Sequence, residues 1–266
     1  MSFDKTSHEL NQQRVLGIWA HPDDEAYLAS GLMQRVTASG GAVTVVAVTD
    51  GEAGFDHSDP RSSAKRAQAR RNEMRGAMAA IGVNDLRFLG IPDGAVADAN
   101  APALVASIAT IMREVCPDLI TTFGPDGITG HEDHIATWSL ATAAWLECQV
   151  GQMLYAAKTV GWLAEWRELH DEFGVWMTEE PTGVPDSSVD LLVDLDDGEA
   201  ELKRRVLAGH RSQTEGIAAA FGEDRYLRWV RQEAFRLPTH AELFDVDAAA
   251  CLANWSHMAT NGSLAA

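Results

Sequence analysis

The sequence predicts an α/β protein, with a Rossmann-like open, mostly parallel sheet, helices on both faces and a less regular C-terminal part. Short, nearly continuous apolar runs recur along the first half of the chain, and such runs are typical of strands buried on both faces. Stretches with helical periodicity separate these runs, which indicates repeated strand–helix units. The length of 266 residues fits one large α/β domain or two modest ones.

Four apolar runs are expected to form parallel strands, and a helical stretch follows each of them. The strands are predicted at residues 15–20, 42–48, 86–89 and 119–123, and the helices at 25–39, 64–81, 103–115 and 134–149. In the first helix Leu28, Leu32 and Val36 recur every four residues, and Gly40-Gly41 supplies the stop. Four such units in a row favour an open, doubly wound sheet.

The second half carries weaker patterns that are expected to complete the sheet. Residues 152–157 and 189–195 are predicted strands, 163–173 and 196–212 are predicted helices, and 179–188 is a predicted loop. We expect a single domain over residues 1–266. Within it, residues 1–13 form an N-terminal extension, residues 14–150 form the core with the functional motifs, and residues 151–266 complete the fold.

The charge of the chain argues against several classes of partner. There are 21 Lys+Arg and 39 Asp+Glu residues, which gives a formal net charge of −18. Such a surface repels nucleic-acid backbones and anionic lipids, so neither nucleic acid nor membrane is an expected partner. No apolar run is long enough to span a bilayer, and the first residues lack a signal-peptide core. The odd set Cys116, Cys148 and Cys251 suggests reduced thiols and a cytoplasmic location.

Two polar clusters follow the first and the fourth predicted strand. The first is Ala-His-Pro-Asp-Asp-Glu at residues 20–25, and the second is Gly-His-Glu-Asp-His at residues 130–134. In an open α/β sheet, sites form in the crevice at the carboxyl ends of the strands. Where strands one and four are neighbours, the two clusters face each other at that edge.

The composition of the two clusters suits a metal ion. Four possible ligands and two further carboxylates are present: His21, Asp24, His131 and His134, with Asp23 and Asp133. A metallohydrolase needs three protein ligands, a base for the water and a donor to the oxyanion, and this set is sufficient. Alone, either cluster could be a capped helix N-terminus or a chance pair of histidines. Their occurrence at matching strand ends favours the metal site.

With these motifs the sequence resembles the LmbE/PIG-L family of zinc-dependent N-deacetylases. Both clusters match the hallmarks of that family, and three lesser features agree: Arg70-x-x-Glu73, Leu-Gly-x-Pro-Asp-Gly at 89–94 and His-x-Ser-Gln at 210–213. The resemblance implies a hydrolase that removes the N-acetyl group of an N-acetylglucosaminyl-type conjugate. It also implies one Zn²⁺ per chain, although the ligand types alone do not separate zinc from another divalent metal such as Fe²⁺.

The resemblance implies a role for each matching residue of the two clusters. His21, Asp24 and His134 are the implied metal ligands, and Asp23 is the implied general base. Adjacent carboxylates with different tasks make chemical sense, because one group cannot fully ligate the metal and also accept the proton.

Four further residues receive implied roles around the reacting groups. His131 would stabilise the oxyanion, and Asp133 would orient a histidine. Arg70 and Asp93 would contact the sugar-like part of the substrate. The residues alone allow plainer roles, because Arg70 could pair with Glu73 on its helix and Asp93 could be a turn residue.

Two positions depart from the family pattern and leave the substrate open. Glu132 stands where many members have Pro, and Thr129 where some have a catalytic Tyr. An amidase that cleaves a larger amide, such as a thiol S-conjugate, is therefore an alternative. A metal-binding module without catalysis is a second alternative. The spare carboxylate of Asp23 argues against it, because a structural metal site needs no base. His210 is expected to cap or pack a helix end, the substrate is expected to be a small molecule, and a homo-oligomer is possible.

Overall fold

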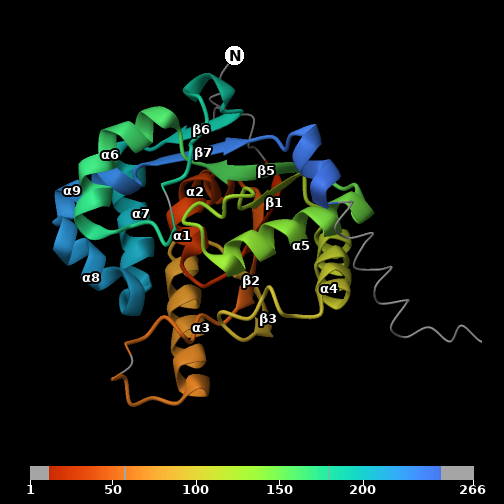
Figure 1. Cartoon of the computed structure of the whole chain (residues 1–266), viewed down its shortest axis with the longest axis horizontal. Coiled ribbons are helices and arrows are strands. Elements are labelled where there is room, and N and C mark those ends of the chain that lie inside the picture. Colours follow the sequence, from red (N-terminus) through yellow and green to blue (C-terminus); the bar gives the residue numbers. More distant parts are fainter. Residues whose placement is uncertain (1–11, 57, 179, 247–266) are drawn as a thin grey trace, which may run out of the picture.

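A computed structural model of the chain confirms the α/β class and the mostly parallel sheet. It describes residues 12–56, 58–178 and 180–246. The seven-stranded sheet of this described part has the order β3-β2-β1-β4-β5-β7-β6 (Figure 1). The strands are β1 Arg14–Trp19, β2 Ala42–Thr49, β3 Asp85–Ile91, β4 Leu119–Thr122, β5 Gln152–Ala157, β6 Leu191–Asp194 and β7 Gln232–Arg236. The helices are α1 Asp24–Leu28, α2 Ser30–Ala38, α3 Ser63–Ala79, α4 Ala101–Val115, α5 Glu132–Cys148, α6 Val160–Phe173, α7 Asp197–Gly209, α8 Arg211–Phe221 and α9 Glu223–Val230, with a 3-10 turn at Asp186–Ser188.

Helices cover both faces of the sheet, as predicted. Along β1 the side chains alternate, because successive residues of a strand point to opposite faces. Leu16 and Ile18 pack with α4 and α5, whereas Val15 and Trp19 pack with α2, α3 and α7. Each face of the parallel strands is therefore buried, which explains why the strands appear in the sequence as continuous apolar runs.

The two polar clusters meet because β1 and β4 are neighbours in the sheet. The two strands run parallel, with Val15 paired to Leu119 and Gly17 to Thr121, so both end at the same edge. The helices that follow them, α1 and α5, pack mainly on opposite faces. This is the switch point of a doubly wound sheet, where a crevice opens between the two connections.

Two predicted helices are each divided in the structure. The predicted helix 25–39 is α1 followed by α2, and Ala29, with φ −144° and ψ −2°, separates them. The second helix begins there because the buried carboxylate of Glu233 accepts hydrogen bonds from the backbone N–H groups of Gly31 and Leu32. The predicted helix 196–212 ends at Gly209, and His210 (φ −86°, ψ 48°) joins α7 to α8.

The prediction for the second half also missed a strand. β7 pairs antiparallel with both β5 and β6, and so attaches the C-terminal part to the parallel sheet. Its sequence, Gln-Glu-Ala-Phe-Arg, contains the buried Glu233 and gives no apolar alternation to detect. Most of the predicted N-terminal extension and Cys251 lie outside the described residues. Among the helices that the structure describes, none has the length and apolar character needed to cross a membrane.

Candidate metal centre

Three side chains from the two clusters converge at the carboxyl edge of β1 and β4. His21 Nδ1 lies 3.1 Å from His134 Nε2 and 3.6 Å from Asp24 Oδ2. His134 Nε2 lies 3.3 Å from Asp24 Oδ1. All three residues are buried. The structure therefore brings together the three residues whose ligand role the family resemblance implies.

These separations fit a small tetrahedral cation. Zinc binds imidazole nitrogen and carboxylate oxygen at about 2.0–2.2 Å, so two ligand atoms at a tetrahedral angle lie about 3.3–3.5 Å apart. The His21–His134 separation of 3.1 Å and the separations of 3.3 and 3.6 Å from these nitrogens to the two oxygens of Asp24 lie close to that value. A second triple of His21, Asp93 and His131 also lies within ligand distance, but it shares His21 with the first.

The second nitrogen of each histidine ligand has its own hydrogen-bond acceptor. His134 Nδ1 lies 2.9 Å from the carbonyl oxygen of Gly127, and His21 Nε2 lies 3.0 Å from Asp93 and 3.2 Å from Asp133. A proton on these nitrogens leaves His21 Nδ1 and His134 Nε2 with free lone pairs that face Asp24. Such outer contacts fix the tautomer and the ring orientation that a metal site requires.

The carboxylates give the centre a strong preference for positive charge. Burial acts to lower the pKa of His21, but Asp133, Asp24 and Asp93 outweigh it and hold the pKa well above its usual value. Burial also opposes ionisation of Asp24, yet His134 and His21 lower its pKa to about 2. Without a metal, the centre therefore stabilises a proton on His21. The same negative field attracts a divalent cation.

Asp23 lies beside the three ligands and has a different set of partners. Its Oδ1 lies 3.3 Å from the guanidinium of Arg70, and its backbone N–H donates to Glu25. Its φ of 130° is an uncommon value for a residue with a side chain, and such strain is held by the surrounding contacts. Burial raises its pKa to about 6, with Arg70 opposing and Asp24 adding to the rise. A carboxylate with that pKa can exchange a proton near neutral pH.

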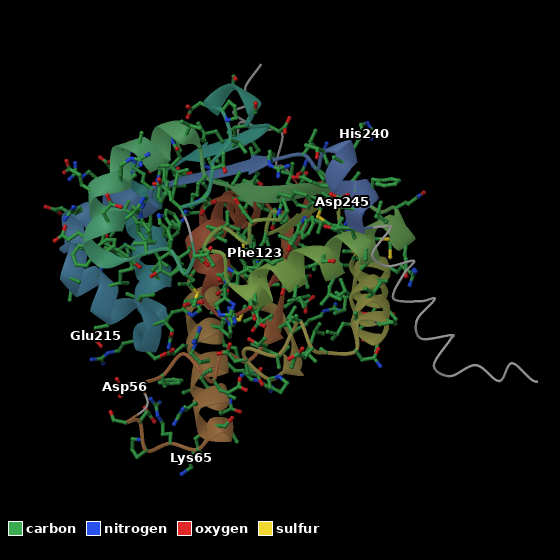
Figure 2. All side chains as sticks on the ribbon, viewed as in Figure 1. Asp56, Lys65, Phe123, Glu215, His240 and Asp245 are labelled. Atoms are coloured by element: carbon green, nitrogen blue, oxygen red, sulfur yellow. The ribbon has the colours of Figure 1, made fainter. Side chains whose placement is uncertain are left out.

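His131 presents a donor to the same space. It is the N-cap of α5, and its Nδ1 accepts a hydrogen bond from the backbone N–H of Asp133 at 3.0 Å. The proton of a neutral ring therefore sits on Nε2. The ring stacks on His134 with centroids 4.9 Å apart, and Phe123, central in Figure 2, stacks on the other side of His134 at 4.2 Å.

A cavity of about 540 Å³ opens over these groups. His21, Asp23, Asp24, His131 and His134 line one part of it. Its other walls come from loops and α3 in the first half of the chain and, in the C-terminal half, from α6, the segment after it, α8 and α9. The arrangement can thus hold a cation, a water, a base and a hydrogen-bond donor against a bound small molecule.

Several known proteins are similar to this chain. A family model described as PIG-L, GlcNAc-PI de-N-acetylase, matches residues 16–145. A 1D-myo-inositol 2-acetamido-2-deoxy-alpha-D-glucopyranoside deacetylase of Saccharomonospora viridis is 30% identical over 227 residues, which cover 75% of this chain and 84% of that protein. The chain belongs to the PIG-L family.

Two other matches differ in how much of each protein they cover. The deacetylase of the same name from Kineococcus radiotolerans is 32% identical over 154 residues, and the match spans 46% of this chain but only 42% of that relative. The solved structure of an N,N'-diacetylchitobiose deacetylase from Pyrococcus horikoshii superposes with a TM-score of 0.60 at 23% identity. That match covers 85% of this chain and 84% of the other, and it supports the fold.

In the structure, Arg70 contacts other groups than those the sequence suggested. Its buried guanidinium donates to the carbonyl oxygens of Pro22 and Gly51 and faces Asp23. The alternative pairing with Glu73 is not the one observed, because Glu73 accepts hydrogen bonds from the backbone N–H and the hydroxyl of Ser212. Arg70 still borders the cavity, so its predicted contact with substrate stays a prediction.

Asp93 and Asp133 both lie against His21. Asp93 also accepts from the backbone N–H of Ala53, so it links two loops as well as the histidine. Asp133 accepts from the backbone N–H groups of Gly94 and Val96. Backbone donors therefore hold both carboxylates in place, and the role of each in catalysis stays a prediction.

Some residues at the site received no role there from the sequence, although two of them stand in its motifs. Glu25 is fully buried, and its Oε1 lies 2.9 Å from His210 Nε2, so this pair lies behind Asp23. His210 does occupy a helix end, as expected, but its contact with Glu25 was not foreseen. Lys158 and Trp229 also line the cavity and stand in no recognisable motif.

Proposed function

We propose that the chain is a metal-dependent hydrolase that removes the N-acetyl group from an N-acetylglucosaminyl-type conjugate. One observation carries the proposal: two imidazole nitrogens lie 3.1 Å apart with the Asp24 carboxylate 3.3–3.6 Å from them, and the carboxylate of Asp23 stands beside this set without joining it. A purely structural metal site has no use for such a spare base. The printed name of the Saccharomonospora viridis relative, a deacetylase of an acetamido sugar, supports the same reaction.

His21 Nδ1, a carboxylate oxygen of Asp24 and His134 Nε2 would hold the cation. When bound, a divalent cation polarises the amide carbonyl and acidifies the attacking water. Asp23 accepts a proton from that water as the new C–O bond forms. His131 Nε2–H donates a hydrogen bond to the developing oxyanion. The C–N bond then breaks, and the proton held by Asp23 passes to the leaving nitrogen, so that the products are acetate and a free amine.

The proposal also covers the identity of the metal, the type of substrate and the cellular location of the enzyme. Zinc suits a site of two imidazoles and one carboxylate, and one ion per chain is proposed. The net charge of −18 supports a small-molecule substrate rather than nucleic acid or a lipid surface. A cytoplasmic location remains part of the proposal, on the strength of the cysteine content.

Two variants separate metal binding from catalysis. We expect wild-type protein to hold about one zinc per chain and to release acetate from methyl N-acetylglucosaminide, with loss of activity after chelation. Asp23→Asn should keep the metal but lose roughly 10²–10⁴-fold in kcat, as expected when a general base is removed. His134→Ala should lose both metal and activity. The measurements are elemental analysis and an acetate assay on the same samples.

Asp98→Asn is the matched control, because it removes an exposed carboxylate from the loop before α4. It should retain metal and activity. Full activity in Asp23→Asn would refute the assignment of the base. A metallated wild-type protein that releases no acetate from any acetamido sugar would favour the binding-module alternative.

A further inference from the structure

The cavity continues past the metal centre into a region with aromatic and aliphatic walls, which we call the apolar arm. Its lining comes from α1, α6, α8, α9 and the segment after α6: Tyr27, Trp162, Val175, Trp176, Ile217 and Trp229. The ring centroid of Trp229 lies 6.0 Å from that of Tyr27 and 6.0 Å from that of Trp162. The three rings therefore form one packed surface. In Figure 1, α6, α8 and α9 lie together at the end of the molecule away from α4.

The apolar arm is continuous with the metal centre. Tyr27 follows Asp24 within α1, so one short helix contributes to both regions. On the opposite side, the backbone N–H of Met177 donates to the carbonyl oxygen of Thr129 at 3.0 Å, and both residues line the cavity. A molecule whose acetamido group reaches the metal centre can thus place its other end in the arm.

A single lysine supplies the charge of the apolar arm. Lys158 directly follows β5, lines the cavity and holds its Nζ 4.3 Å from the ring centroid of Trp162. Across residues 12–56, 58–178 and 180–246, no carboxylate forms an ion pair with it. Burial lowers its pKa to about 7, with Lys203 adding to the effect and Glu233 opposing it. Lys158 is therefore an amine without a counterion, and an anion bound beside it would stabilise its charged form.

Two further donors in this wall also lack partners. The indole N–H groups of Trp162 and Trp176 are buried, and neither has an acceptor among the described residues. Trp229 differs, because its indole N–H donates to His170 Nε2 at 3.1 Å. Burial lowers the pKa of His170 to about 4, so that ring is neutral and adds no charge. Buried donors are normally paired, but other atoms cover both indole nitrogens, so neither faces the open cavity and Lys158 is the polar group that the arm offers to a ligand.

We propose that the apolar arm binds the aglycone of the substrate, and that this aglycone is an aromatic or similarly apolar group bearing one anionic substituent. The apolar body covers the rings and aliphatic side chains, and the anion pairs with Lys158. A neutral polyol fits less well, because its hydroxyls would be buried against carbon without acceptors. The inference rests on the proposed deacetylase function and specifies its substrate class.

Four glycosides test the inference on the wild-type enzyme loaded with zinc. They are N-acetylglucosaminides with methyl, myo-inositol, phenyl and 4-carboxyphenyl aglycones, and the readout is kcat/KM for acetate release. We expect 4-carboxyphenyl to exceed phenyl, and phenyl to exceed both others. A buried hydrogen-bonded charge pair predicts a ratio of roughly 10- to 100-fold for carboxyphenyl over phenyl.

Two variants assign the preference to the arm. Lys158→Met should lower the carboxyphenyl-to-phenyl ratio by roughly 10-fold or more, whereas Lys65→Met, at an exposed lysine at the outer end of α3 (Figure 2), should leave it unchanged. Ile217→Ser should lower the phenyl-to-methyl ratio by roughly 4-fold or more. Val160→Ser, at an exposed position on α6, is its control.

The outcomes distinguish this inference from the proposed function. If none of the four glycosides released acetate, the deacetylase proposal itself would fail. Equal kcat/KM values for all four would leave the deacetylase in place and overturn the assignment of the arm. A wild-type preference that survives Lys158→Met would also overturn it, since the anion would then be recognised elsewhere.

Discussion

The two parts of the cavity are built in opposite ways. The metal centre comes from residues that are adjacent in sequence, within 20–25 and 130–134, and backbone groups fix most of its side chains. The apolar arm comes from scattered residues on α1, α6, the segment after α6, α8 and α9, and its aromatic members are held by packing of ring on ring. Both parts share one cavity, but they depend on different physical interactions.

This difference predicts different responses to mutation. Hydrogen-bonded polar groups in a buried site are highly sensitive, because one lost partner leaves another group buried and unsatisfied. Packed apolar walls respond more gradually, since neighbouring side chains can adjust. We therefore expect changes at the metal centre to abolish turnover, and changes in the arm to alter which substrate is preferred.

The largest effect of a substitution, a loss of unfolding free energy, is expected where the second half of the chain is attached to the first. Lys203 on α7 donates to the carbonyl oxygen of Tyr27 and pairs with Glu233 of β7 at 2.6 Å, with both side chains fully buried. Lys203→Met leaves the carboxylate of Glu233 buried without its cation, which costs about 3–5 kcal/mol of unfolding free energy. Urea denaturation followed by circular dichroism measures this.

Two comparisons sharpen this test of the attachment. Lys65→Met should change the unfolding free energy by less than about 0.5 kcal/mol, because Lys65 is exposed. The double variant Lys203→Met/Glu233→Gln should recover part of the loss, since it removes the unpaired charge. A loss below about 1 kcal/mol in Lys203→Met would show that the pair does not join the two halves.

The next largest effect is expected on the pH dependence of kcat/KM, which the general base Asp23 should set. The pKa of Asp23 is raised by burial to about 6, and Arg70 opposes the rise. Asp23 must be ionised to accept a proton, so kcat/KM should fall as pH drops below about 6, roughly tenfold per unit. Removal of the guanidinium in Arg70→Met should raise this pKa further and move the acid limb to higher pH.

Arg70→Met should also lower the maximal kcat/KM by roughly 10²-fold, through the lost positioning of Asp23. Arg66→Met, one turn earlier on α3, is the control and should keep the wild-type pH profile. An acid limb that stays in place in Arg70→Met would mean that Asp23 is not the group that titrates. The measurement is initial-rate kinetics for methyl N-acetylglucosaminide from pH 5 to 9.

The same contrast explains what the sequence could predict. The apolar runs predicted the parallel strands, and the position of the two motifs after the first and fourth strands predicted a site at their carboxyl ends. The choice of His21, Asp24 and His134 among four possible ligands came from the family resemblance. The break at Ala29 could not be predicted, because its cause is Glu233, which lies about two hundred residues later in the chain. Lys158 and Trp229 were missed because long-range packing, rather than spacing, brings them to one cavity.

The smallest effect is expected at a helix start that lies outside the cavity lining. Asp196 caps α7, where its side chain accepts from the backbone N–H of Glu199 at 2.8 Å and Glu199 returns a hydrogen bond to the backbone of Asp196. Asp196→Ala should cost about 1 kcal/mol of unfolding free energy. Asp171→Ala, at an exposed site on α6, should cost less than about 0.5 kcal/mol. Neither variant should alter the phenyl-to-methyl ratio of kcat/KM, because α7 does not line the arm and Asp171 is an exposed side chain outside the cavity lining. A changed ratio in Asp196→Ala would mean that the stability of α7 sets the shape of the arm, and that the two parts of the cavity are not held independently.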